Sequence, residues 1–290
     1  MQKKGQPIKP IAHPMLGRPF WTVFAVMAFV LTLSATAALA AAEAPLVSNA
    51  PAATAAELDL EAKAILMKMA EFIAKEPAFS VTLRSGYDAI QEDGQYIEFG
   101  EKRHILLQRP DRLRVETERS DGERGLVLFD GKQITAFKAD DNVYTRVEKP
   151  GTVDDALVYL VRDLQFTLPM ARLLHTGFPQ QIEKKVTAIS YVEENTLFDV
   201  ITDHLAIRSE DVDMQLWVAQ GDQPLSRRVI LTYKNAPGQP QFRGDFSEWS
   251  FAPKVAADSF TFTPPAGAEL VPLLAPVRQK GSLPAQKGGE

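Results

Sequence analysis

The feature that most limits the fold of this 290-residue chain is a series of short segments in which apolar and polar residues alternate. The clearest is 126–147, where two alternating runs flank Asp130-Gly131 and a third follows "ADDN". Such alternation is typical of half-buried strands, and Asp, Gly and Asn mark short turns between antiparallel neighbours. The pattern therefore predicts a meander of ten or eleven antiparallel strands rather than βαβ units. The candidate segments for the further strands are 79–86, 95–108, 111–118, 184–193, 197–203, 212–219, 227–235, 241–251 and 259–263.

Two stretches have helical spacing instead. Apolar residues recur every three or four positions over 57–75, and Pro77 ends that pattern. A second helical region at about 152–177 begins with the capping residue Thr152, breaks near Pro169 and ends at Gly177. The predicted fold class is α+β: an incomplete, strongly curved antiparallel β-barrel with an N-terminal helix and a helical lid insert.

The first forty residues have the composition of an export signal. A basic start precedes an apolar run, and Ala38 and Ala40 fit the small-x-small pattern of a signal-peptidase site. We expect cleavage after Ala40, and cleavage after Ala42 fits nearly as well. The alternative is an uncleaved anchor, since 19–42 carries no charge and could just span a bilayer. The alanine-rich end of that stretch favours the cleaved signal and a periplasmic location.

The rest of the chain divides into a flexible leader at 41–56, a single domain at 57–274 and a disordered tail at 275–290. There is no cysteine, so the chain has neither disulfides nor the N-terminal thiol that anchors a lipoprotein. Without 1–40, 28 basic residues face 37 acidic ones, a net charge of −9. That balance argues against nucleic acid or an anionic membrane as partner.

No motif for catalysis stands out. Beyond the signal, the histidines His104, His175 and His204 lie far apart, in no zinc-binding spacing, and there is neither a G-x-S-x-G elbow nor a phosphate loop. Asp203 beside His204 could form a weak site, but capping a turn is the more common role of such a pair. The sequence therefore predicts a non-catalytic protein without cofactor or metal.

A curved sheet that does not close leaves an interior, and the chain has many aromatic residues that could line it. For any one of these residues, simple core packing is the alternative. The candidate lining residues for a bound ligand are Phe79, Phe99, Phe129, Phe137, Leu157, Leu160, Phe198, Trp217, Trp249, Phe260 and Phe262.

Three blocks resemble the outer-membrane lipoprotein carriers (LolA/LolB-like). "FTFTPPAG" at 260–267 is similar to their closing strand, "LLQRPDRLRVE" at 106–116 to their arginine-proline strand, and "LFDGKQITAF" at 128–137 to their D-G-K hairpin. The segment 198–242 departs from the transporting carriers and more closely resembles an uncharacterised branch of predicted periplasmic proteins with this fold.

The resemblance implies a half-barrel with a lid over a hydrophobic cavity. It implies a carrier for a lipid acyl chain or an acylated protein, exchanged with an envelope donor or acceptor. In this family the arginine before proline, here Arg109, is associated with holding the lid shut; the alternative is a structural pin at a strand entry. Two other functions remain open: a periplasmic regulator or scaffold that binds a protein partner, and a hydrolase, for which the sequence offers no catalytic group.

Overall fold

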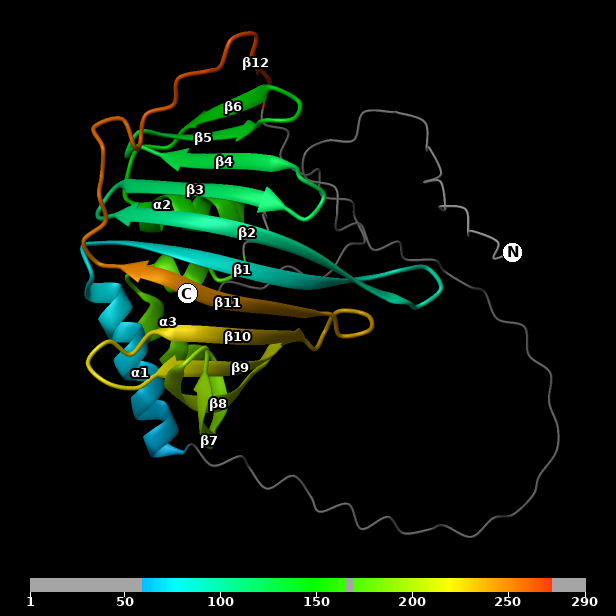
Figure 1. Ribbon diagram of the computed structural model, residues 1–290, viewed down its shortest axis with the longest axis vertical. Coiled ribbons are helices and arrows are strands. Elements are labelled where there is room, and N and C mark those ends of the chain that lie inside the picture. Colours follow the sequence, from blue (N-terminus) through cyan, green and yellow to red (C-terminus); the bar gives the residue numbers. More distant parts are fainter. Residues whose placement is uncertain (1–58, 165–168, 273–290) are drawn as a thin grey trace, which may run out of the picture. The chain divides into compact units, whose positions relative to one another are not determined.

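The computed structural model describes residues 59–164 and 169–272, which form a single curled sheet with helices on one face (Figure 1). The strand order is β12-β6-β5-β4-β3-β2-β1-β11-β10-β9-β8-β7, and only β12 runs parallel to its neighbour. Within the described residues β7 and β12 are not paired with each other, so the predicted incomplete barrel is confirmed, with twelve strands. The strands are β1 (Ala78–Ile90), β2 (Tyr96–Gln108), β3 (Arg112–Arg119), β4 (Arg124–Phe129), β5 (Gln133–Lys138), β6 (Val143–Glu148), β7 (Val186–Leu197), β8 (Val200–Ser209), β9 (Val212–Ala219), β10 (Ser226–Tyr233), β11 (Gln241–Ser250) and β12 (Glu269–Leu270).

The predicted N-terminal helix is α1 (Leu60–Lys75). Asp59 caps it by accepting hydrogen bonds from the backbone of Glu61 and Ala62 at 3.0 and 3.1 Å. The other oxygen of Asp59 accepts from the backbone N–H of Tyr191 in β7 at 2.9 Å. One carboxylate thus begins the helix and fixes it to the end strand of the sheet.

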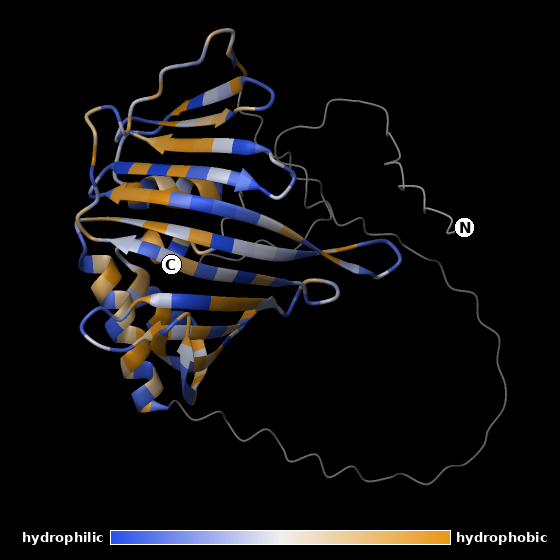
Figure 2. Cartoon of the chain, viewed as in Figure 1, coloured by the Kyte–Doolittle hydropathy of each residue, from blue (hydrophilic) through white to orange (hydrophobic). Residues whose placement is uncertain are grey.

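The two faces of the sheet differ in composition, and Figure 2 shows the hydropathy of each residue. Residues paired directly across antiparallel strands share a face. The series Phe79–Leu107–Leu113–Phe129 is therefore on one face, which is buried and which we call the helix face. The series Arg84–Lys102–Glu118 is on the other, which we call the open face.

The predicted lid is present but longer than expected. It consists of α2 (Val153–Val158), the π-helical turn η1 (Tyr159–Asp163), the 3-10 turn η2 (Ala171–Leu174) and α3 (Phe178–Lys185), together called the helical cover. Thr152 and Asp155 cap α2 reciprocally, as the sequence indicates. The strand predicted from 184 begins at Val186, because α3 continues to Lys185.

The C-terminal segment contradicts one prediction. Residues 259–263 form no strand. They belong to 251–268, which we call the strap: it begins at Phe251, beside Phe72 and Phe79, and then crosses the open face. Arg114 in β3 donates to the Ser259 carbonyl oxygen at 3.0 Å, and the Phe262 ring lies 5.5 Å from that of Phe137 and 5.3 Å from that of Tyr144. Pro264 and Pro265 lack the N–H donors that a ladder needs, and only Glu269–Leu270 joins the sheet.

A second correction concerns the β7–β8 hairpin. The sequence predicts a break between 193 and 197, but β7 continues to Leu197. Phe198 and Asp199 form the two-residue turn, with φ of 51° and 60°. Both angles are in the left-handed region that such turns require, although Phe rarely occupies it.

Candidate functional site

The first candidate site lies between the helix face and the helical cover. The cover turns its apolar side chains inward, and Val153, Leu157, Leu160, Leu173 and Leu174 are all buried. The backbone N–H of Val153 donates to the Pro110 carbonyl oxygen at 2.8 Å, which fixes the start of α2 beside the β2–β3 turn. The cover is thus an apolar layer that meets the sheet at that turn.

Arg109, at the same turn, connects three parts of the chain. Its Nε donates to the Glu76 carbonyl oxygen at 3.1 Å, at the end of α1, and its Nη1 donates to the Leu174 carbonyl oxygen at 2.9 Å, at the end of η2. Nη2 is buried and has no hydrogen-bond partner among the described residues. Burial lowers the pKa of the guanidinium, and the charge of Asp154 opposes that shift. The guanidinium remains charged at neutral pH and fastens the cover with two donors.

Asp154 makes a second set of contacts within the cover. Its carboxylate accepts from the Thr176 backbone N–H at 3.1 Å and from the Thr176 hydroxyl, which ties α2 to the segment after η2. The Nδ1 of His175 lies 3.7 Å from Asp154 Oδ2 and accepts the Gly177 N–H at 2.8 Å. The two halves of the cover are therefore held together by one exposed cluster of polar contacts.

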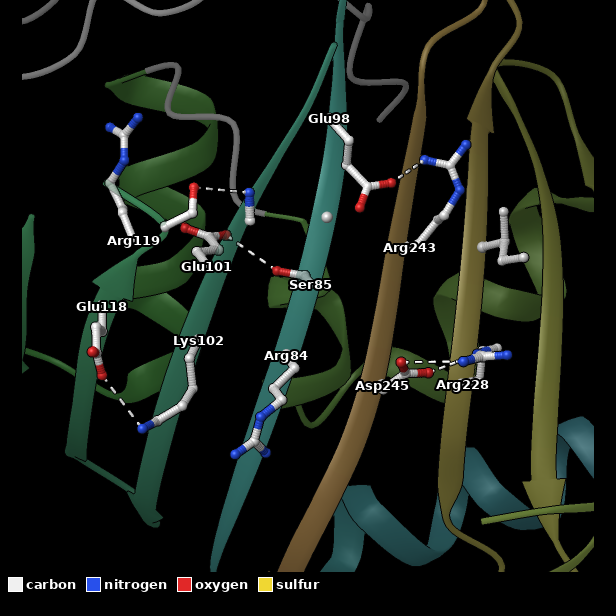
Figure 3. A pocket seen from close by; sticks show the side chains of 14 residues that line it. Arg84, Ser85, Glu98, Glu101, Lys102, Glu118, Arg119, Arg228, Arg243 and Asp245 are labelled. Carbon is white, nitrogen blue, oxygen red and sulfur yellow. Dashed lines mark hydrogen bonds and ion pairs between the residues drawn. The ribbon is translucent and has the colours of Figure 1, made fainter. Parts of the chain in front are cut away.

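The second candidate site is a groove of about 680 Å³ on the open face, where β3, β2, β1, β11 and β10 lie side by side (Figure 3). Gly86 and Gly100, paired directly across β1 and β2, form its floor. The figure shows three ion pairs around it: Arg243–Glu98 at 3.1 Å, Arg228–Asp245 at 2.6 Å and Lys102–Glu118 at 3.4 Å. This groove was not predicted from the sequence, in which two glycines inside strand patterns were the available signal.

Comparison with protein families gives one match, to a family described as "Predicted periplasmic protein (DUF2092)", over residues 62–274. The chain belongs to this family. The expected branch of predicted periplasmic proteins is thereby confirmed, and its description agrees with the predicted export. In residues 59–164 and 169–272, no helix combines the length and the apolar character needed to cross a membrane. A comparison with curated proteins finds no match.

The DUF2092 chain is also similar to several solved structures. One is LprF from Mycobacterium bovis, with 10% identity and a TM-score of 0.45; the match covers 71% of this chain and 100% of that chain. Another is the LolA superfamily protein NE2245 from Nitrosomonas europaea, with 13% identity and a TM-score of 0.35; the match covers 69% of this chain and 97% of that chain. A third is Pseudomonas aeruginosa MucB in its complex with MucA (16%, 0.38, 70% of this chain); the match spans about 61% of that chain.

In this DUF2092 protein, part of the predicted lining set meets on the helix face. Phe79 and Phe129 have 0% and 1% of their surface exposed, so neither borders a space that a water molecule could enter. Trp249 packs against Phe79 and Phe246, with ring centroids 5.5 and 5.9 Å away. Leu157 and Leu160 are buried in the helical cover.

The other predicted lining residues lie apart from that group. Phe137 and Phe262 pack together on the open face, and Phe260 belongs to the strap above that face. Phe99 is on the helix face but toward the β1–β2 hairpin tip, where it stacks on Tyr87 at 6.0 Å. Phe198 is half exposed at its hairpin tip, with the Arg228 guanidinium 5.2 Å from its ring centroid. Period-two alternation reveals that two faces exist but does not say which residues of distant strands share one.

His204 and Asp203 occupy adjacent positions on β8 but do not form a catalytic pair. The His204 ring stacks on Trp217 with centroids 4.0 Å apart, and its Nε2 lies 3.3 Å from Gln215 Oε1. Burial lowers the pKa of His204, which keeps it neutral at pH 7. Asp203 accepts from Gln220 at 2.8 Å instead. The described residues hold no group of three or more His, Asp or Glu side chains able to share a metal ion.

Proposed function

We propose that this exported protein binds an amphiphile and takes its acyl chain between the helix face and the helical cover, without catalysing a reaction. The observation that carries the proposal is the position of Arg109. Its guanidinium donates hydrogen bonds to Glu76 and Leu174 and so holds an apolar cover against an apolar sheet face. A cover fastened by a few polar contacts at one turn can open without unfolding the sheet.

The proposed driving force is the burial of the acyl chain, which stabilises the complex by about 0.8 kcal/mol per methylene. A chain of about fourteen carbons would contribute some 10 kcal/mol before ordering costs. Arg109 Nη2 has a free donor that suits an anionic headgroup, since a guanidinium binds carboxylate or phosphate through several N–H groups at once.

The packing of the core gives the proposal a mechanism. Phe79 and Phe129 are completely enclosed, so a ligand needs the cover to move away before it can reach them. Uptake then exchanges contacts between cover and sheet for contacts between acyl chain and sheet. Release follows when the cover closes again or a receiving protein competes for the cargo.

The test is a titration with 11-(dansylamino)undecanoic acid, whose fluorescence rises when it leaves water. We expect one site per chain, and we expect Leu157→Trp, which adds bulk beneath the cover, to abolish uptake. Arg208→Ala removes an exposed arginine of β8, away from the cover, and serves as the control variant. Saturable binding that is lost in Leu157→Trp and retained in Arg208→Ala would support the proposal; no uptake by the wild-type protein would overturn it.

The alternative function is a regulator or scaffold that binds a protein through its surface. The complete enclosure of Phe79 and Phe129 favours it, because a core filled by the chain's own aromatics needs no cargo. Crosslinking in the periplasm of the native host distinguishes the two. A regulator would retain one specific crosslinked partner in the Leu157→Trp variant, whereas a carrier would lose its cargo.

A further inference from the structure

The register of the strands places two glycines together in the middle of the open face. Gly86 of β1 pairs directly with Gly100 of β2, within thirteen consecutive pairs that contain no bulge. On the other side of Gly100 lies Ser120, directly after the end of β3, and its backbone N–H donates to the Gly100 carbonyl oxygen at 2.8 Å. The floor of the groove is therefore backbone and one small side chain at Gly100, whereas the Glu98 carboxyl group lies over Gly86.

Neither glycine is needed for backbone conformation. Neither φ lies in the left-handed region, and a Cβ built on Gly100 would meet only ordinary contacts, 3.7 Å from Ser120 Cβ and 3.7 Å from the Ser85 carbonyl oxygen. A Cβ on Gly86 would approach the movable Glu98 carboxyl group. Glycine inside a strand costs stability. Gly86 leaves room for the Glu98 side chain, but Gly100 has no such neighbour, and a strand glycine without local cause indicates that something approaches the backbone closely.

The side chains beside the floor supply hydrogen-bond donors. Arg84 and Lys102 are directly opposite each other across β1 and β2, and like charges in that arrangement repel. Lys102 pairs with Glu118 at 3.4 Å. The Arg84 side chain forms no ion pair or hydrogen bond with any other described residue. The Ser120 hydroxyl oxygen accepts the Gly100 N–H at 3.3 Å, which leaves its own O–H free to donate.

We propose that the Gly86–Gly100 groove binds a phosphate group, held by Arg84, Lys102 and the Ser120 hydroxyl over the glycine floor. An anion at this position removes the repulsion between the two cations. A tetrahedral phosphate presents oxygens in several directions, which matches three donors that come from β1, from β2 and from the residue after β3. This site is on the opposite face of the sheet from the acyl site and does not depend on it.

The acidic residues nearby have partners of their own. Glu98, whose carboxyl group lies over Gly86, pairs with Arg243 at 3.1 Å and has to turn away before a phosphate can reach that half of the floor. Glu248 accepts the Thr82 hydroxyl at 2.6 Å, and this hydrogen bond lowers its pKa most, with smaller contributions from the charges of Arg84, His104 and Lys102. Glu118 is exposed and holds Lys102 only through a long contact. Exposed pairs of this kind contribute little, so a phosphate can replace Glu118 at small cost.

The test is a titration of the exported, full-length protein with inorganic phosphate, followed by amide NMR shifts at Gly86, Gly100 and Ser120. We expect saturable shifts at these three amides and at least tenfold weaker binding in Arg84→Ala. Arg208→Ala removes the same charge from the same face outside the groove and should bind as the wild type does. Equal weakening in both variants would overturn the site, because it would indicate a general charge effect.

Gly100→Ala tests the floor separately. The added methyl group fits the sheet and fills the groove, so we expect binding to weaken at least fivefold while the melting temperature is unchanged or rises by about 2 °C. Gly125→Ala is the control, since its Cβ would also have 3.7 Å of room, on the helix face of β4. A clear fall in melting temperature with unchanged phosphate binding would show that the glycines serve the curvature of the sheet, and would overturn the proposal.

The phosphate could be free or part of a lipid headgroup. Vesicles of phosphatidylglycerol and of phosphatidylcholine, tested with the same variants, distinguish these sources. Binding to phosphatidylglycerol vesicles that requires Arg84 and Gly100 would assign a headgroup, and binding of inorganic phosphate alone would assign free phosphate. If neither probe binds in an Arg84-dependent manner, the proposal is wrong.

Discussion

The two faces of the sheet are made by the same strands but differ in how their side chains are used. On the helix face, Phe129 and its partner Leu113 across β3 and β4 are buried, with 1% and 3% of their surface exposed. On the open face, one residue further along each strand, charged side chains surround a glycine floor. Successive residues of one strand therefore belong in turn to the stabilising core and to the exposed surface. Mutations on the two faces should differ strongly in how much they lower the free energy of unfolding.

The largest expected contrast is between two phenylalanines in adjacent strands. Phe129→Ala empties an enclosed position and should lower the free energy of unfolding by about 3–5 kcal/mol. Phe137→Ala, half-buried beneath the strap, should lower it by roughly 1–2 kcal/mol. Urea unfolding followed by tryptophan fluorescence measures both. Equal losses would contradict the assignment of the core to the helix face.

The attachment of the cover gives the next effect. Arg109→Met keeps the apolar stem but removes the donors to the carbonyl oxygens of Glu76 and Leu174, which should lower the free energy of unfolding by about 1.5–3 kcal/mol. Hydrogen exchange should accelerate in 153–163 and 171–174 more than in β1 or β2. Arg109→Lys keeps the charge without the fork of donors, so its free energy of unfolding should lie between those of the wild type and of Arg109→Met. Uniform acceleration over the whole chain would mean that Arg109 is a general structural pin.

The contact between α1 and the end strand should make stability depend on pH. The pKa of Asp59 lies below its ordinary value of 3.8. The largest cause is the hydrogen bond from the Tyr191 backbone, and the next is the one from the Ala62 backbone. The stabilisation is therefore complete above that value and is lost as the pH falls through the lower pKa of the folded state. Asp59→Asn should reduce the fall in melting temperature between pH 6 and pH 3, and Asp258→Asn in the strap is the control. An unchanged pH profile in Asp59→Asn would exclude this role.

The smallest effect is expected at the tip of the β7–β8 hairpin. Asp199 has φ of 60° in the turn, so Asp199→Gly should raise the free energy of unfolding by about 0.5 kcal/mol. Thermal unfolding of the two proteins side by side detects such a change. A loss instead of a gain would show that the Asp199 side chain holds the turn.

The sequence was sufficient for most elements that have a clear local pattern, although it missed the end of β7. Alternation located most strands, and the spacing after Asp59 located α1, because each element buries its own apolar stripe. The β9 prediction at 212–219 coincides with the observed strand. Thr152 and Asp155 likewise indicated the start of α2 through chemistry contained within four residues.

Long-range relations could not be predicted. Phe260 and Phe262 alternate like strand residues, but their segment packs across the open face, where a distant cluster around Tyr144 receives it. The eight residues of α3 were missed because they are largely polar and their start is marked only by Pro179. The groove above Gly86 and Gly100 depends on the pairing of two strands, which no single stretch of sequence contains. Arg109, which the family resemblance associated with holding the lid shut, lies at the junction between cover and sheet; its role in gating stays a prediction.

The most direct test of the carrier proposal is native mass spectrometry of the exported protein, purified from a periplasm without detergent. The account predicts a discrete added mass that solvent extraction removes and that is identified as a lipid or acyl species. A clean apo mass, together with no uptake of the fluorescent fatty acid, would contradict it and leave the protein-binding regulator as the better explanation.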